Sequence, residues 1–292
     1  MSHKSKQFLL QAGKLLVILC CLAYVFYLFQ GDTFDWHHTV AFLSNIPIYF
    51  YLLLPGLSIA SWLVESYKWQ YLVRDLREVR FRESVIHNLT SQATSFITPL
   101  RAGEFATKAF YFESSLRKKV LKAVLVGNMS QMAVTIIVGV AGVAALFYSE
   151  VLSLFSIIFL ATLVVWLGPT ISKRIDFQAA RLDGVILLSF LRYALFSGCW
   201  LILLSFYSNA SLITIAASVA AMYLATSLIP SLQLFDILIK WSVATFFVSY
   251  LNLPIENMTA IVAIVWLNNT VLPALLGCGL LAFQRFPKLI AA

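Results

Sequence analysis

Apolar stretches long enough to cross a lipid bilayer recur along almost the whole of this sequence. A helix needs about 20 mostly apolar residues to span the hydrocarbon core. Full spans are predicted near residues 8–29, 46–66, 120–147, 150–168, 184–207 and 258–283. Because backbone N–H and C=O groups find no water in that core, we expect these stretches to be helices. The predicted fold class is an all-α, polytopic bundle of membrane helices.

The overall composition agrees with this class. Hydrophobic residues make up 61% of the chain, charged residues 12%, and the mean hydropathy is +0.87. Such values are far from those of soluble domains. We expect a single membrane domain over residues 1–292, without a soluble catalytic domain. The four cysteines lie in apolar runs without metal-ligand spacing, so no disulfide, metal site or cofactor is expected.

Basic loops orient the predicted spans, because loops rich in Lys and Arg stay in the cytoplasm. Such loops follow the second span at 74–82 and recur at 117–122 and 173–181. Both chain ends are also basic, so the N- and C-termini are predicted to be cytoplasmic. The net charge of +8 indicates attraction to anionic lipid headgroups and not to nucleic acid.

Residues 84–113 lie between two of these basic loops and must therefore leave and return on one side. A helix over 84–99 would be about 24 Å long, which is too short to span the core. We therefore predict a re-entrant helical hairpin. Residues 210–251 form either a second hairpin or two full spans. The bundle then has about six full spans with two re-entrant hairpins, or eight spans.

The two unusual segments also resemble each other. A shift of 132 residues places Glu104 on Asp236 and Lys108 on Lys240, and Pro99 falls one position from Pro230. Chance is one explanation of this weak similarity. The other is an inverted repeat, since three full spans separate the segments, and half-repeats would cover 1–147 and 148–292. Broken helices in inverted repeats are typical of secondary transporters.

The charged residues of these segments need partners. A charge at the centre of a membrane helix costs about 2.5–3.5 kcal/mol. An acid four residues before a lysine lies on the same helix face, so Glu104 can pair with Lys108 and Asp236 with Lys240. A second acid and lysine, Glu65 and Lys68, are expected to form a pair at the membrane interface.

Arg101 precedes the predicted start of a half-helix, where free backbone N–H groups favour an anion. Its guanidinium can bind a phosphate through two hydrogen bonds. Arg192 adds a positive charge inside another apolar stretch, "SFLRYALF". With Lys108 and Lys240 the interior cations exceed Glu104 and Asp236 by two, which favours an anionic headgroup as the ligand.

The stretch "TPLRAGEF" resembles the signature of the lysylphosphatidylglycerol synthase transmembrane region family of flippase-like proteins. The preceding "SYKWQYLV" is similar to the end of that family's second helix. Pro99, Arg101, Gly103 and Glu104 match the first family motif. The segment "IPSLQLFD" keeps Pro230 and Asp236 but lacks the glycines of the second motif.

The resemblance implies a multi-span protein of the bacterial inner membrane that translocates lipid between leaflets. Some members carry a soluble aminoacyl-transferase domain, which is not expected here, so lipid aminoacylation is not predicted. The predicted partner is an anionic membrane lipid, and the oligomeric state stays open. The residues predicted to bind it are Arg101, Gly103, Glu104, Lys108, Arg192, Asp236 and Lys240.

Three alternatives to an anionic-phospholipid flippase remain. The protein could carry a polyprenyl phosphate or a glycan-linked lipid, which the same phosphate-binding residues would hold. It could be a membrane-embedded enzyme that uses Glu104 and Asp236 as acid and base, although no nucleophile–base pair supports catalytic residues. It could also be a scaffold for an envelope synthase.

Overall fold

The computed structural model describes residues 35–175, 182–229 and 235–283, and these residues are helical without any strand. The prediction of an all-α bundle is therefore confirmed. The predicted first span, 8–29, lies outside the described residues. The described helices are α2 (Trp36–Ser44), α3 (Phe50–Val73), α4 (Phe81–Ile97), α5 (Ala102–Phe110), α6 (Arg117–Phe147), α7 (Glu150–Ile175), α8 (Leu182–Tyr207), α9 (Leu212–Leu228), α10 (Asp236–Phe246), α11 (Val248–Leu251), α12 (Ile255–Trp266) and α13 (Leu272–Phe283).

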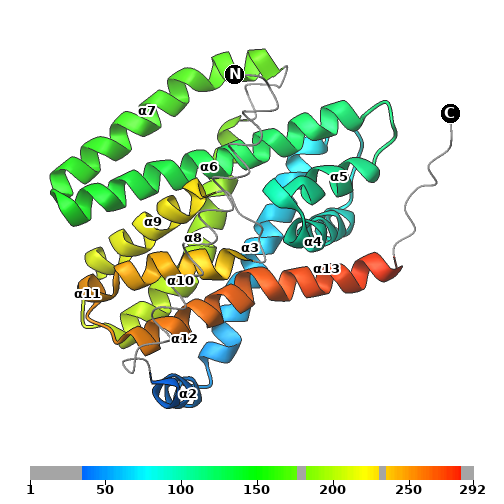
Figure 1. Ribbon diagram of the computed structural model, residues 1–292. Helices are drawn as coiled ribbons and strands as arrows, with labels where there is room; N and C mark the ends of the chain where they lie inside the picture. The colour runs from blue at the N-terminus through cyan, green and yellow to red at the C-terminus, as the bar shows by residue number, and fades with distance from the viewer. Residues whose placement is uncertain (1–34, 176–181, 230–234, 284–292) are drawn as a thin grey trace, which may run out of the picture.

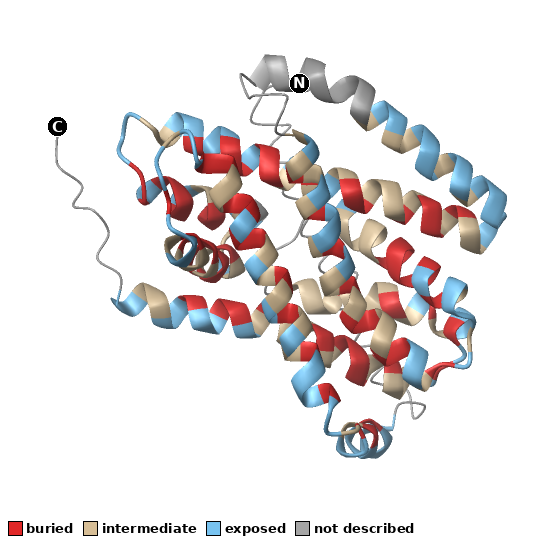
Figure 2. Cartoon of the chain, turned by 180° about the vertical axis from the view of Figure 1, so that it is seen from behind, coloured by how far each residue is buried: buried red, intermediate tan, exposed pale blue. Residues whose placement is uncertain are grey.

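Within the described part, three helical stretches are long and apolar enough to cross a membrane. They are α6, α8 and the continuous stretch Ile255–Phe283, which joins α12 to α13 through a π-helical turn. Each contains a stretch that the sequence predicts to be a full span. The helix α7 packs on α6 at the outer edge of the molecule (Figure 1). Its described side chains are mostly exposed and apolar (Figure 2), as expected of a lipid-facing helix.

The helices α3 and α8 form a long antiparallel pair. The rings of Phe50 and Phe206 lie 5.2 Å apart at one end of this pair. At the other end Gly184 packs against Tyr71, whose ring atoms would lie 3.2 Å from a Cβ at the glycine. The pair connects two separate hydrophobic cores, because each helix contributes its two ends to different clusters.

The first core gathers the start of α3, the end of α8 and parts of α9 to α12, around Phe50, Trp200 and Met258. The second core gathers the end of α3 with parts of α5 and α6, around Trp69 and Phe112. Because lipid is as apolar as these cores, close van der Waals packing of the large side chains, and not exclusion of water, holds the helices together.

The predicted first hairpin is formed by α4 and α5, which follow each other and pack together. A single turn of 3-10 helix, Pro99–Arg101, joins them. At the open end of the hairpin the guanidinium of Arg77 donates a 3.4 Å hydrogen bond to the carbonyl of Tyr111. This contact brings the basic loop after α3 beside the segment that leads into α6. A hairpin whose two ends lie on the same side needs such a contact between the segments before and after it.

Glycines allow the close approach of α4 to its neighbours. A Cβ at Gly103 of α5 would meet the Thr94 carbonyl of α4 and would lie 2.7 Å from the hydroxyl of Thr98. On another face of α4, the Leu89 carbonyl occupies the space where a Cβ of Gly277 would stand. The polar helix α4 is thereby held against both α5 and α13.

The second unusual segment consists of α9 and α10, which also contact each other. The residues that join them, including Pro230, lie outside the described part of the chain. α9 packs closely on α6, where a Cβ at Gly142 would lie 2.7 Å from the Ala217 carbonyl. Whether this segment enters the membrane as a hairpin or as two spans stays a prediction.

Candidate functional site

A group of buried charged and polar side chains lies between the two hydrophobic cores. Along α3, α6 and α8 these side chains follow the residues of one core and precede those of the other. We call this group, together with Arg101 at its exposed side, the polar layer. Its members are Glu65, Lys68, Arg101, Glu104, Lys108, Asn128, Ser189 and Arg192.

Glu104 holds together one half of the polar layer. Its Oε1 accepts a hydrogen bond from Lys108 Nζ at 2.9 Å, one helical turn further along α5. Its Oε2 lies 3.1 Å from an Nη atom of Arg101 and accepts a 3.3 Å hydrogen bond from Asn128 of α6. The acid–lysine spacing in the sequence therefore forms the expected pair. Asn128, which the sequence reasoning did not select, completes the surroundings of the carboxylate.

Arg101 stands at the turn between α4 and α5 in a left-handed conformation, with φ 56° and ψ 28°. This conformation is uncommon for a residue with a Cβ, and such strain often occurs at functional sites. The side chain is 40% exposed although it is paired with Glu104. Its Nε is buried without a hydrogen-bond partner among the described residues. Because part of the side chain is exposed, the guanidinium can also take an acceptor from outside the chain.

The start of α5 offers fewer free N–H groups than the sequence analysis expects. The N–H of Gly103 donates to the hydroxyl of Thr98 at 2.8 Å, and the N–H of Ala102 donates to the Pro99 carbonyl. Pro99 begins the 3-10 turn that makes these contacts. The anion-binding capacity at this point therefore comes mainly from the Arg101 side chain.

Glu65 holds together the other half of the polar layer. Its Oε2 lies 2.7 Å from Lys68 Nζ and 3.2 Å from an Nη atom of Arg192, on the facing helix α8. Lys68 also donates a 3.3 Å hydrogen bond to Ser189 of α8. The predicted Glu65–Lys68 pair is present, but it does not lie at a surface. Lys68 is only 1% exposed, because the packing of α8 on α3 encloses both side chains.

The two halves lie side by side. The Lys108 ammonium lies 4.5 Å from the centre of the Trp69 ring, and Trp69 directly follows Lys68 in α3. Glu104, the partner of Lys108, also accepts a hydrogen bond from Asn128 of α6. A Cβ added at Gly127, which precedes Asn128, would lie 4.0 Å from Lys68 Cε. The polar layer is thus one continuous electrostatic unit.

The formal charge of the polar layer is positive. Four cations, on Lys68, Arg101, Lys108 and Arg192, face two carboxylates, on Glu65 and Glu104, so the sum is 4 − 2 = +2. Burying unbalanced charge in an apolar bundle is costly. The arrangement is therefore suited to a ligand with negative charge.

Asp236 and Lys240 form their predicted pair on α10, with 2.6 Å between Oδ2 and Nζ. No ion pair or hydrogen bond within the described segments joins this pair to the polar layer. The sequence predicts that both residues share one interior set with Arg101 and Arg192, whereas in the structure they form a separate pair. Glu65 and Lys68 supply the acid and the lysine that join Arg192.

The helix α4 brings unusual polarity into the bundle. Its buried side chains include His87, whose ring stacks on Tyr111 at a centroid distance of 4.0 Å and accepts a hydrogen bond from Trp69 Nε1 at 3.3 Å. The other buried polar residues of this helix are Ser84, Asn88, Thr90, Ser91, Gln92 and Ser95. These groups bond mainly to α4 carbonyls and to Ser66 of α3, so they also keep the interior polar beside the charged residues.

A π-helical turn, Leu267–Val271, adds polar backbone atoms near the polar layer. The Asn269 carbonyl accepts a 3.4 Å hydrogen bond from Trp62 Nε1, and the ring of Trp62 lies 5.3 Å from the Arg192 guanidinium carbon. π-turns inside helices are frequent at functional sites. The sequence shows only two adjacent asparagines here, and it does not predict the turn.

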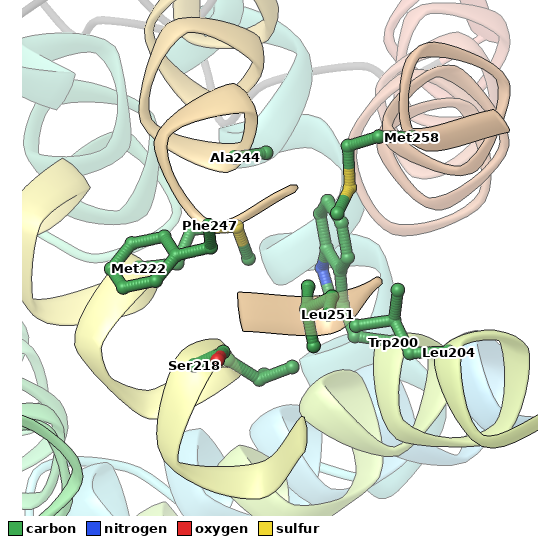
Figure 3. A pocket seen from close by; sticks show the side chains of 9 residues that line it. Trp200, Leu204, Ser218, Met222, Ala244, Phe247, Leu251 and Met258 are labelled. Atoms are coloured by element: carbon green, nitrogen blue, oxygen red, sulfur yellow. The ribbon is translucent and has the colours of Figure 1, made fainter. Parts of the chain in front are cut away.

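A small cavity of about 10 Å³ lies inside the first hydrophobic core, away from the charged residues. Figure 3 shows Trp200, Ser218, Met222 and Met258 around it. The volume suffices for about one water molecule. Because its lining is almost wholly apolar, this cavity is not the candidate site. Among the described residues no group of three or more His, Cys, Asp or Glu side chains could hold a metal ion.

The helical bundle with its long apolar spans defines an integral, multi-pass membrane protein. The chain belongs to the lysylphosphatidylglycerol synthase TM region family, whose model matches residues 11–183. The match includes the hairpin with Arg101 and Glu104 and ends before Arg192, so part of the polar layer lies beyond it. Membership in this family associates the protein with the biosynthesis or movement of membrane lipid. Comparison with curated proteins and with solved structures found no match.

Proposed function

We propose that this protein is a flippase-like transporter that moves an anionic phospholipid between the leaflets of the bacterial inner membrane, with both chain ends in the cytoplasm. The observation that carries the proposal is the polar layer, which holds a formal charge of +2 inside a lipid-facing bundle. Such intramembrane charges typically mark the path of a substrate.

Arg101 makes the first contact with the lipid phosphate in this proposal. It is the most exposed cation of the polar layer, and its Nε is not engaged by the described residues. A phosphate that approaches it competes with Glu104 for the guanidinium. Lys108 stays with Glu104, so the carboxylate keeps a partner while Arg101 turns to the ligand. Glu104 thereby holds both cations in place before the lipid arrives.

The positions of the helices also support a transporter. A shift of 132 residues moves the ends of α3 and α4 to within two residues of the ends of α8 and α9. The same shift moves the ends of α5 to within four residues of those of α10, and it places Glu104 and Lys108 on Asp236 and Lys240. This agreement favours the half-repeats 1–147 and 148–292, an organisation found in many secondary transporters.

Replacing Arg101 with alanine is expected to slow the movement of fluorescently labelled phosphatidylglycerol between proteoliposome leaflets at least about tenfold. The reason is the loss of a charge-assisted contact with phosphate, typically about 1.5–3 kcal/mol. Arg101→Gly is the second variant, because glycine accepts the left-handed backbone of this position without strain. It removes the guanidinium and leaves the turn relaxed.

The matched control is Arg82→Ala, which removes an exposed arginine near the open end of the hairpin. We expect this control to keep the parental rate. If Arg101→Gly folds normally by size-exclusion chromatography and moves lipid as fast as Arg82→Ala, the role of Arg101 is rejected. A slow Arg101→Gly variant with a normal elution profile supports it.

A further inference from the structure

We propose that the group bound in the polar layer is a phosphomonoester, which carries two negative charges, and not a phosphodiester, which carries one. The inference rests on the proposed function and specifies the chemical class of its headgroup. Two observations carry the inference. Each carboxylate of the polar layer is shared by two cations, and two hydrogen-bond donors of the arginines have no partner within the described part of the chain.

Each carboxylate of the polar layer is shared by two cations. Glu104 lies between Arg101 and Lys108, and Glu65 lies between Lys68 and Arg192. One positive charge is therefore left over at each carboxylate. Lys68 and Lys108 are 1% and 2% exposed, so water cannot solvate their ammonium groups well. The surplus needs a counter-charge from outside the chain.

A dianion balances this surplus and a monoanion does not. A phosphodiester headgroup such as that of phosphatidylglycerol leaves the polar layer with one unbalanced positive charge. The second pKa of a phosphomonoester is about 6, so at pH 7 the form with two negative charges predominates. The Asp236–Lys240 pair does not change this sum, because it is neutral as a unit.

The unused hydrogen-bond donors also call for an anionic oxygen acceptor. The Nε atoms of Arg101 and Arg192 are both buried without partners among the described residues. A buried donor without an acceptor is unfavourable, and each half of the polar layer contains one. The terminal oxygens of a phosphate are acceptors of this kind. The unused donors thus support a phosphate ligand, and the charge balance selects the phosphomonoester.

The test is a comparison of ligand affinities for the purified full-length chain in detergent at pH 7. Phosphatidic acid, a phosphomonoester, and phosphatidylglycerol with the same acyl chains are titrated, and binding is followed by native mass spectrometry. We expect phosphatidic acid to bind at least about tenfold more tightly, because one further charge is balanced. Inorganic phosphate, tested as a competitor, separates a soluble ligand from a lipid. Displacement by phosphate at concentrations similar to those of phosphatidic acid would identify a soluble phosphate.

Lys68→Met reduces the surplus from two charges to one and is expected to bring the preference for phosphatidic acid to within about twofold. If this variant does not fold, Lys68→Gln removes the charge and keeps a donor for Ser189. Lys119→Met, an exposed lysine outside the polar layer, is expected to keep the full preference.

The outcomes separate the two proposals. Equal affinities of the two lipids, both lost in Arg101→Gly, would overturn the phosphomonoester class and leave the lipid transporter standing. Unchanged preference in a folded Lys68 variant would also overturn it. Binding of both lipids that is independent of Arg101 would reject the transporter site itself.

Discussion

Replacing Glu104 with glutamine is expected to destabilise the folded protein by about 3–5 kcal/mol, because the buried Lys108 then keeps its charge but loses the carboxylate that it pairs with directly. Lys108 is 2% exposed and lies within α5, so it cannot turn to water. Arg101 is less affected, since its side chain is 40% exposed. The change is measured as the lowered unfolding temperature of the protein in detergent micelles.

The matched control is Glu83→Gln. Glu83 pairs with Arg77 at 3.3 Å, but both side chains are 44% exposed, and such surface pairs contribute no more than about 1 kcal/mol. The double variant Glu104→Gln/Lys108→Met removes both charges of the buried pair and is expected to regain part of the lost stability. Equal unfolding temperatures of Glu104→Gln and Glu83→Gln would show that the burial of this pair has no energetic consequence.

Replacing Gly277 with alanine is expected to destabilise the protein by about 1–3 kcal/mol or more, which is the usual cost of overpacking. The added methyl group would overlap the Leu89 carbonyl, a backbone atom that cannot rotate away. The helices α13 and α4 must then separate, which also disturbs the hairpin that carries Arg101. We expect a lower unfolding temperature and faster proteolysis near the start of α4.

Gly279→Ala supplies a control on the same helix, since a Cβ at Gly279 meets nothing within 4 Å. Alanine favours a helix over glycine by about 1 kcal/mol. The control is therefore expected to be neutral or slightly stabilising, so the two substitutions should have opposite signs. A Gly277→Ala variant as stable as Gly279→Ala would mean that α4 and α13 do not pack as closely as the structure shows.

The positions of the helices were largely predictable from hydropathy and length. The predicted spans at 120–147, 184–207 and 258–283 lie within long helices, and the break near Pro99 separates α4 from α5. The i, i+4 spacing also predicted which acid pairs with which lysine. These features depend on residues that are near one another in the chain, so local rules are sufficient for them.

The composition of the site was only partly predictable. Nothing in the sequence of α3 separates a surface pair from a buried one, and Glu65 and Lys68 became part of the polar layer only because α8 brings Ser189 and Arg192 against them. Asp236 lies four residues before a lysine, as Glu104 does, but the Asp236–Lys240 pair does not belong to the polar layer. Asn128 becomes part of the polar layer because α6 packs against α5.

The sequence by itself thus determined a helical membrane bundle, the break at residues 98–101 and the local ion pairs, because apolar length, proline and helical spacing act within one segment. Only the tertiary structure decided which of the charges are buried together. That choice depends on the register between helices distant in the chain, such as α3 with α8, and on glycines like Gly277 that allow them to approach.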